Sequence, residues 1–160
     1  MDLLDIMLGH DHWATTQLLE RSRELTDTQL DQQFDIGNRT LRETLDHMIA
    51  TIDFWTRSMA GQPLPADRTG RPSTAELTER YERYSAAFAT FALRARDANR
   101  LVDTFVHHMG YPQSLGSTII HLMYHNAQHR GDARHILERL GVSDLWDFDP
   151  QEWENVTQRG

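Results

Sequence analysis

The stretch that decides the fold is Ile119–Leu140, which reads IIHLMYHNAQHRGDARHILERL. At about 100° per residue, one side of a helix over this stretch is apolar: Ile119, Leu122, Met123, Ala133, Ile136, Leu137 and Leu140. His125 and His129 lie inside or at the edge of that side. At this spacing the two imidazoles occupy neighbouring turns, about 5–6 Å apart at their Cβ atoms. The spacing therefore favours two ligands from one helix to one metal ion, pointing into a core.

His121 continues the spacing, but it cannot bind the same ion as His129. The two residues lie about 12 Å apart along the helix at 1.5 Å per residue. Metal–nitrogen bonds are only about 2.0–2.1 Å long, so a third ligand has to come from another element. Histidines at this spacing are also common as ordinary core or surface residues, and the spacing alone leaves that interpretation open.

Length and composition indicate one globular domain. The chain has 160 residues, 39% hydrophobic and 25% charged, which suits a single domain spanning residues 1–160. The net charge of −8 and the lack of a basic stripe argue against a nucleic-acid partner. No apolar run is long enough to cross a membrane, and no leader pattern is present, so we expect no membrane partner and a cytoplasmic location.

The chain contains no cysteine. Disulfides, thiolate nucleophiles and cysteine-ligated metal sites are therefore excluded within it. Any metal must be bound by histidines and carboxylates, and the sequence holds nine histidines. A thiol nucleophile would have to arrive as a separate small molecule.

Apolar periodicity predicts four long helices. Two of them begin with a capping box, at Thr40 with Glu43 and at Ser73 with Glu76. The expected helices cover about 2–25, 40–60 and 73–98, and the stretch from about 114 to 140. With no convincing strands, this pattern predicts an all-α fold, a four-helix bundle, whose metal sites lie between facing helices.

The segments between the helices are expected to be irregular. Residues 26–39 are polar and suit a connection with a short helical turn, and the proline-rich 62–72 segment is a loop. Residues 101–106 suit a strand-like crossing, after which His107 and His108 are predicted to lie in water. The aromatic tail after Gly141 should pack against the body, because its large rings favour burial.

Two carboxylates are candidates for a catalytic base. Asp11 falls on the apolar stripe of the first helix, where an unpaired carboxylate is costly. Either the helix bends or meets water there, or Asp11 lies beside the metal-binding histidines. Asp132 lies one turn from His129 near the same face and is the second candidate. Arg130 points off the ligand face, which predicts capping or a surface ion pair.

Three stretches resemble the DinB/YfiT-like family of metalloenzymes, the damage-inducible proteins. Asp11–Ala14, with the leucines that follow, is similar to the family's first-helix signature. Thr40–His47, followed by Trp55, is similar to its second-helix histidine segment. His121–Gly131 is similar to its hallmark helix. The chain departs from the family at Asp132, where Gln is usual, and at His10-Asp11, often Tyr-Asn.

The resemblance implies a four-helix bundle with a divalent metal ion held by three histidines, one on the second helix and two on the hallmark helix. By position these are His47, His125 and His129. Periodicity alone makes His47 a half-buried residue on the flank of its helix and not a ligand, so its assignment comes from the resemblance. Zinc, nickel and iron all suit imidazole ligands.

The resemblance also implies an enzyme that transfers or isomerises adducts of low-molecular-weight thiols and acts on a small-molecule substrate. Three protein ligands leave open positions on the ion for a thiol or for water. Two alternatives stay open: a metal-dependent hydrolase that uses water, and a non-enzymatic stress-response or binding module with a structural metal. Relatives are often dimers and the tail is aromatic, so we expect a homodimer.

Overall fold

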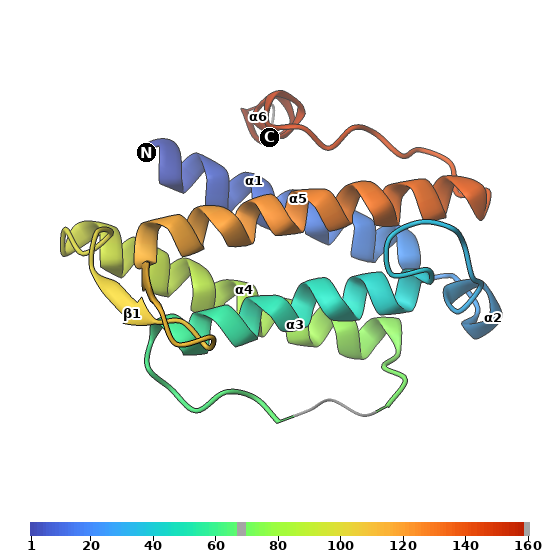
Figure 1. The fold of residues 1–160 in the computed structure, drawn as a ribbon. Coiled ribbons are helices and arrows are strands. Elements are labelled where there is room, and N and C mark those ends of the chain that lie inside the picture. Colours follow the sequence, from blue (N-terminus) through green and yellow to red (C-terminus); the bar gives the residue numbers. More distant parts are fainter. Residues whose placement is uncertain (67–69, 159–160) are drawn as a thin grey trace.

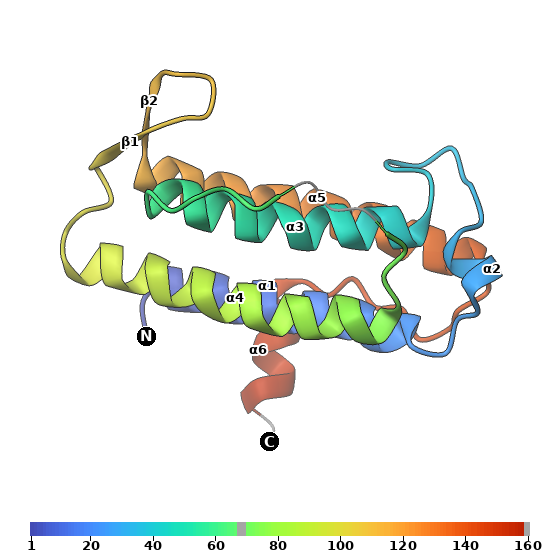
Figure 2. The same ribbon diagram turned by 90° about the horizontal axis from the view of Figure 1, so that it is seen from below.

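Four long helices, α1, α3, α4 and α5, run alongside one another as a bundle in two layers, with α3 and α5 in one layer and α1 and α4 in the other (Figures 1 and 2). The computed structural model describes residues 1–66 and 70–158. Its elements are α1 (Leu3–Ser22), α2 (Asp27–Leu30), α3 (Leu41–Met59), α4 (Thr74–Asp97), β1 (Thr104–Val106), β2 (Pro112–Ser114), α5 (Leu115–Arg139) and α6 (Pro150–Gln158). The predicted all-α fold is confirmed.

The helices begin where the capping residues predict. Thr40 Oγ1 accepts a hydrogen bond from the backbone N–H of Glu43 at 3.1 Å, at the start of α3. Ser73 and Glu76 bond reciprocally at the start of α4, each side chain accepting from the other's backbone N–H. Each cap satisfies amide groups that the first helical turn leaves without partners, so the caps fix where α3 and α4 start.

The bundle interior is filled by aliphatic and aromatic side chains from all four long helices. The largest fully buried ones include Leu18, Leu19, Leu45, Ile49, Ile52, Leu77, Tyr81, Leu122 and Ile136. Burying one such side chain contributes about 1.5–3 kcal/mol, so the interior fixes which side of α3 and of α5 faces inward. The sides that remain outside carry the candidate site.

The segment before α5 is an antiparallel hairpin in which Thr104 pairs with Ser114. The prediction that His107 lies in water is wrong, because its side chain is buried. The ring stacks on Tyr111 with 4.3 Å between centroids, and its Nδ1 accepts from the backbone N–H of Met109 at 3.1 Å. The hairpin folds back over Trp55 of α3, 5.0 Å from the His107 ring, which removes this ring from solvent. His108 is exposed, as predicted.

The tail packs on α1, as its aromatic content predicts. Phe148 is buried, and its carbonyl oxygen accepts a hydrogen bond from His10 Nε2 at 2.7 Å. Trp153 of α6 covers Gly9, where an added Cβ would lie only 2.7 Å from the indole. Figure 2 shows α6 on the side of the α1 and α4 layer away from α3 and α5.

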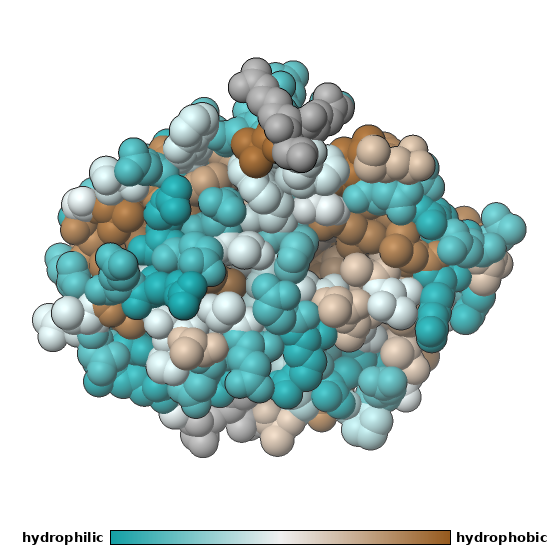
Figure 3. All heavy atoms as spheres, turned by 180° about the vertical axis from the view of Figure 1, so that it is seen from behind, coloured by the Kyte–Doolittle hydropathy of each residue, from teal (hydrophilic) through white to brown (hydrophobic). Residues whose placement is uncertain are grey.

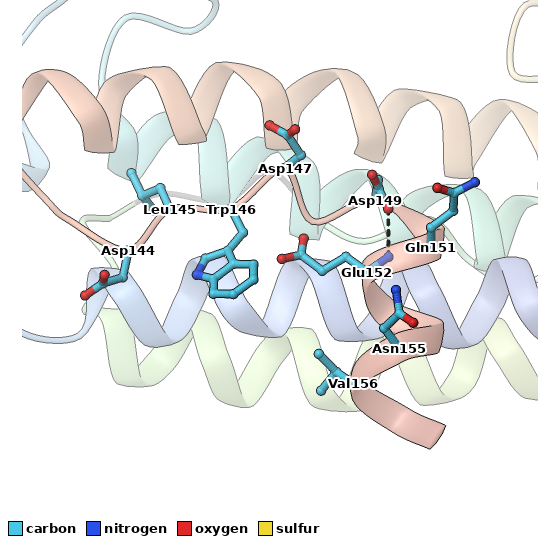
Figure 4. Close-up of a pocket in the computed structure, with 9 residues that line it drawn as sticks. All are labelled: Asp144, Leu145, Trp146, Asp147, Asp149, Gln151, Glu152, Asn155 and Val156. Atoms are coloured by element: carbon cyan, nitrogen blue, oxygen red, sulfur yellow. Dashed lines mark hydrogen bonds between the residues drawn. The ribbon is translucent and has the colours of Figure 1, made fainter. Parts of the chain in front are cut away.

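A cavity of about 790 Å³ is lined by residues of the tail and of α6, several of them carboxylates (Figure 4). Two of them form hydrogen bonds at the start of α6. Asp149 accepts a hydrogen bond from the backbone N–H of Glu152 at 2.8 Å, and Glu152 accepts one from the backbone N–H of Phe148 at 2.7 Å. Asp147 lies 3.4 Å from Arg134 of α5. Two of these carboxylates therefore order the start of α6, and among the described residues only Asp147 pairs with the bundle.

The face turned away from the view of Figure 1 is largely hydrophilic, with separate hydrophobic patches (Figure 3). Within residues 1–66 and 70–158, no helix combines the length and the apolar character that crossing a membrane requires.

Candidate metal centre

Three histidine side chains from α3 and α5 converge on one point. His125 Nε2 lies 3.1 Å from His47 Nε2 and 3.1 Å from His129 Nε2. The ligand atoms of the three residues all lie within 4.8 Å of one another, a group able to hold a metal ion. The structure thus brings together the three histidines that the resemblance selected, including His47, which periodicity alone set aside.

The spacing of the three nitrogens fits a shared ion. Nitrogens bound to one ion at about 2.0–2.1 Å lie about 2.8–3.4 Å apart, depending on the angle between the bonds. Hydrogen bonds alone do not account for both short contacts, because one imidazole nitrogen carries either one lone pair or one N–H. A donor set of three imidazoles suits zinc, nickel or iron.

The site lies at the surface, between α3 and α5, and not in the core as the helix pattern predicted. His47 is exposed, and His125 and His129 are half-buried. The pKa of His125 falls to about 4, chiefly because burial disfavours the charged ring and also because His129 and His47 lie close by. A neutral imidazole is the form that binds metal, so the surroundings of His125 favour the binding form at neutral pH.

A buried polar network sets the rotation of α5. Arg130 NH1 donates to Asp11 Oδ1 of α1 at 2.5 Å and to Thr15 Oγ1 at 3.2 Å. Asn126 Nδ2 donates to the second oxygen of Asp11 at 3.0 Å. Because Asn126 and Arg130 directly follow His125 and His129 in sequence, fixing this pair on α1 turns the two histidines toward α3.

This network corrects the expectation for Arg130, which is buried and paired in the interior instead of capping α5 or forming a surface pair. It also places Asp11, whose carboxylate hydrogen-bonds Arg130 and Asn126 and none of the three histidines. The sequence held a signal for this arrangement. Asp11 lies on the apolar face of the first helix, and Asn126 and Arg130 lie one turn apart on the hallmark helix.

Asp132, the second candidate base, lies beside the triad. Its Oδ2 is 3.4 Å from His129 Nδ1, an ion-pair distance, although the two atoms do not meet hydrogen-bond geometry. The loop before α3 covers it from outside: an added Cβ on Gly37 would lie 2.5 Å from Asp132 Oδ2. Gly37 has a positive φ of 47°. A side chain there would therefore meet both backbone strain and a direct collision.

His121 lies outside the triad, in keeping with the axial distance argument. Its ring is 6.1 Å from that of His125 and 5.9 Å from the indole of Trp55. His108 of the hairpin also packs against Trp55, with 5.5 Å between ring centroids. An aromatic surface therefore borders the triad on the side of the hairpin.

On its other side, the triad adjoins a cavity of about 440 Å³ that shares His47 as a wall. The remaining lining residues belong to the loop before α3 and to the first turns of that helix: Gly37, Asn38, Arg39, Glu43 and Asp46. Arg39 was not predicted to lie at this cavity, because a polar connection gives no sign of which side chains face a site.

Fold and site together define a helical-bundle protein with a surface histidine triad able to hold a divalent ion. The sequence profile of the DinB family matches residues 2–158, and the chain belongs to that family. Among solved structures, it is similar to a DinB-like protein from Bacillus cereus ATCC 10987, with a TM-score of 0.66 and 20% identity. The match covers 86% of this chain and 91% of that one, and at this identity it shows the fold alone. A search of curated proteins finds no match.

Proposed function

We propose that this protein is a metal-dependent enzyme that holds a divalent ion through His47, His125 and His129 and acts on adducts of low-molecular-weight thiols. The observation that carries the proposal is the convergence of three Nε2 atoms from two helices, with two separations of 3.1 Å. Membership of the DinB family supports the same conclusion.

The arrangement of the side chains suits catalysis better than a closed structural site. Three protein ligands leave coordination positions open, and the exposure of His47 lets a small molecule reach them. A divalent ion supplies Lewis acidity, which favours the deprotonated form of a thiol. The chain has no cysteine, so the thiol comes from a small molecule.

Asp132 is the residue we assign to proton handling. A carboxylate near Nδ1 of His129 favours a proton on that nitrogen, which leaves the Nε2 lone pair available for a metal. Asp132 thereby orients the ring of His129. Of the two candidate bases predicted from the sequence, it is the one that contacts a histidine of the triad, where it could take a proton from a ligand.

The first test is elemental analysis of protein purified without an affinity tag, followed by metal titration of wild type and single variants. We expect His125→Ala and His129→Ala to lose the ion and His121→Ala to keep it. If His121→Ala loses the ion as fully as His125→Ala, the assignment of the ligands is wrong.

The second test compares the loaded protein on thiol adducts with a panel of esters and amides. Turnover of thiol adducts supports the proposal. Turnover of esters or amides alone identifies a hydrolase that uses water. A metal-loaded protein that turns over neither class indicates a non-enzymatic module with a structural metal.

A further inference from the structure

The cavity beside His47 has an arginine in an unusual backbone conformation. Arg39 has a φ of 75°, in the left-handed region that non-glycine residues rarely adopt. Two hydrogen bonds hold it there: Arg39 N–H donates to the Ile36 carbonyl at 2.8 Å, and the Arg39 carbonyl accepts from Phe34 N–H at 2.7 Å. Strained backbone of this kind is found most often at binding and active sites.

The guanidinium of Arg39 has no ion pair or hydrogen bond within the described ranges 1–66 and 70–158. Most other arginines near the loops are paired: Arg42 contacts Asp27 and Asp31, and Arg139 contacts Asp35 at 2.7 Å. The Arg39 backbone is fixed by two hydrogen bonds, and its exposed side chain lines the cavity without a partner among the described residues. Such a cation suits an anionic ligand group. Its planar fork matches a carboxylate with two parallel hydrogen bonds.

The same cavity also offers a carboxylate. Glu43 lies one helical turn before His47, and its Oε2 accepts from Thr40 Oγ1 at 3.0 Å, which leaves its other oxygen for a ligand. Asp46 is already compensated by Arg80, 3.3 Å away. The cavity therefore presents one positive and one negative group to a ligand, and this pair fits a zwitterion.

We propose that this cavity binds the α-amino-acid end of a thiol ligand whose sulfur lies at the histidine triad, with Arg39 binding the carboxylate and Glu43 the ammonium. Glu43 is about 6 Å from His47 along the axis of α3, and Arg39 lies just before the helix. Both side chains line the cavity of which His47 is one wall, so a ligand whose sulfur lies at the triad would extend between them. The inference rests on the proposed metal-dependent thiol chemistry and names the class of thiol.

The test uses three thiols that differ only in their charged groups: L-cysteine, cysteamine, which lacks the carboxylate, and 3-mercaptopropionate, which lacks the ammonium. Their affinities for cobalt-loaded protein are measured by calorimetry and by the cobalt absorption spectrum. The cobalt content is measured after each titration, so that extraction of the ion is not taken for binding. The cavity is open to solvent, so we expect wild type to favour cysteine by about threefold to tenfold.

The variants assign the two charges. Arg39→Gln should reduce the affinity for cysteine to that for cysteamine, and Arg39→Lys should restore part of the difference. Glu43→Gln should reduce the affinity for cysteine to the affinity for 3-mercaptopropionate. Arg83→Gln is the matched control, because it removes one positive charge from an exposed position on α4 and should leave all three affinities unchanged.

Equal affinity of wild type for the three thiols would overturn the inference and leave the metal site standing. The inference also fails if Arg39→Gln and Arg83→Gln weaken cysteine binding to the same extent. A protein that holds cobalt but binds none of the thiols contradicts both the inference and the proposed thiol chemistry. A protein that holds no ion contradicts the proposed function at its first step.

Discussion

Replacing Asp11 by asparagine should destabilise the fold and misplace the metal ligands. Asp11 and Arg130 are 6% and 8% exposed, and the variant leaves the guanidinium buried without a counter-charge. Removing one partner of a buried ion pair typically costs about 3–5 kcal/mol. At about 2–4 °C per kcal/mol for a chain of this size, the melting temperature should fall by roughly 10 °C.

The metal affinity of the folded protein separates orientation from stability. The network that includes Asp11 fixes the rotation of α5, so Asp11→Asn should also weaken metal binding. Leu18→Ala is the matched control: it removes a fully buried side chain from the same helix, at a cost of about 2–5 kcal/mol. It touches none of the polar network's hydrogen bonds and should keep the wild-type metal affinity.

The double variant Asp11→Leu with Arg130→Met completes the test. Replacing a buried ion pair by apolar residues of similar size is often neutral or stabilising, so most of the lost stability should return. The polar contacts that orient α5 stay absent, and metal affinity should remain low. Melting curves and metal titrations on the four proteins decide the matter. If Asp11→Asn binds metal as tightly as wild type does, the network does not orient the histidines.

Three further outcomes are expected. A chelator should lower the melting temperature of metal-loaded wild type, because a ligand at hundredfold excess over Kd stabilises the fold by about 2.7 kcal/mol. It should not lower that of His47→Ala, which lacks one metal ligand. An equal fall in melting temperature in both proteins would show that α3 supplies no ligand. In the metal-free protein the pKa of His125 falls to about 4, below the value of about 6.5 in an unfolded chain, so the unfolded state binds more protons between these values. Stability should therefore be intact above pH 6.5 and decline toward pH 4 in urea titrations, and a flat profile would contradict this. We also expect a homodimer, since Tyr124 and Ile120 lie exposed one turn apart on α5, and a monomer in light scattering at micromolar concentration would exclude it.

The helices and their starts could be predicted because they depend on local features of the chain. Capping at Thr40 and Ser73 and the apolar period act within a few residues, and the structure agrees with them. His125 and His129 share one helix, so their proximity also follows from spacing. His47 belongs to another helix, and its contact with them depends on how far α3 is rotated, which periodicity along α3 does not give.

The errors concern side chains whose surroundings come from distant segments. Arg130 lies off the ligand face, as predicted, but that direction leads to Asp11 in the interior and not to water. His107 is buried because the hairpin folds back on Trp55, a tertiary contact that no local pattern indicates. The backbone of Arg39 is set by hydrogen bonds to Phe34 and Ile36, and its conformation could not be predicted from residue type.

The two crowded glycines should behave differently in a search for second-site suppressors. At Gly9 the obstacle is a side chain, the indole of Trp153, 2.7 Å from an added Cβ. A smaller residue at position 153 can therefore compensate for Gly9→Ala, so the two positions should vary together among functional variants. At Gly37 the backbone itself is left-handed, and shortening Asp132 removes only the collision. The loop over Asp132 should therefore accept few replacements for Gly37, whatever residue stands at position 132.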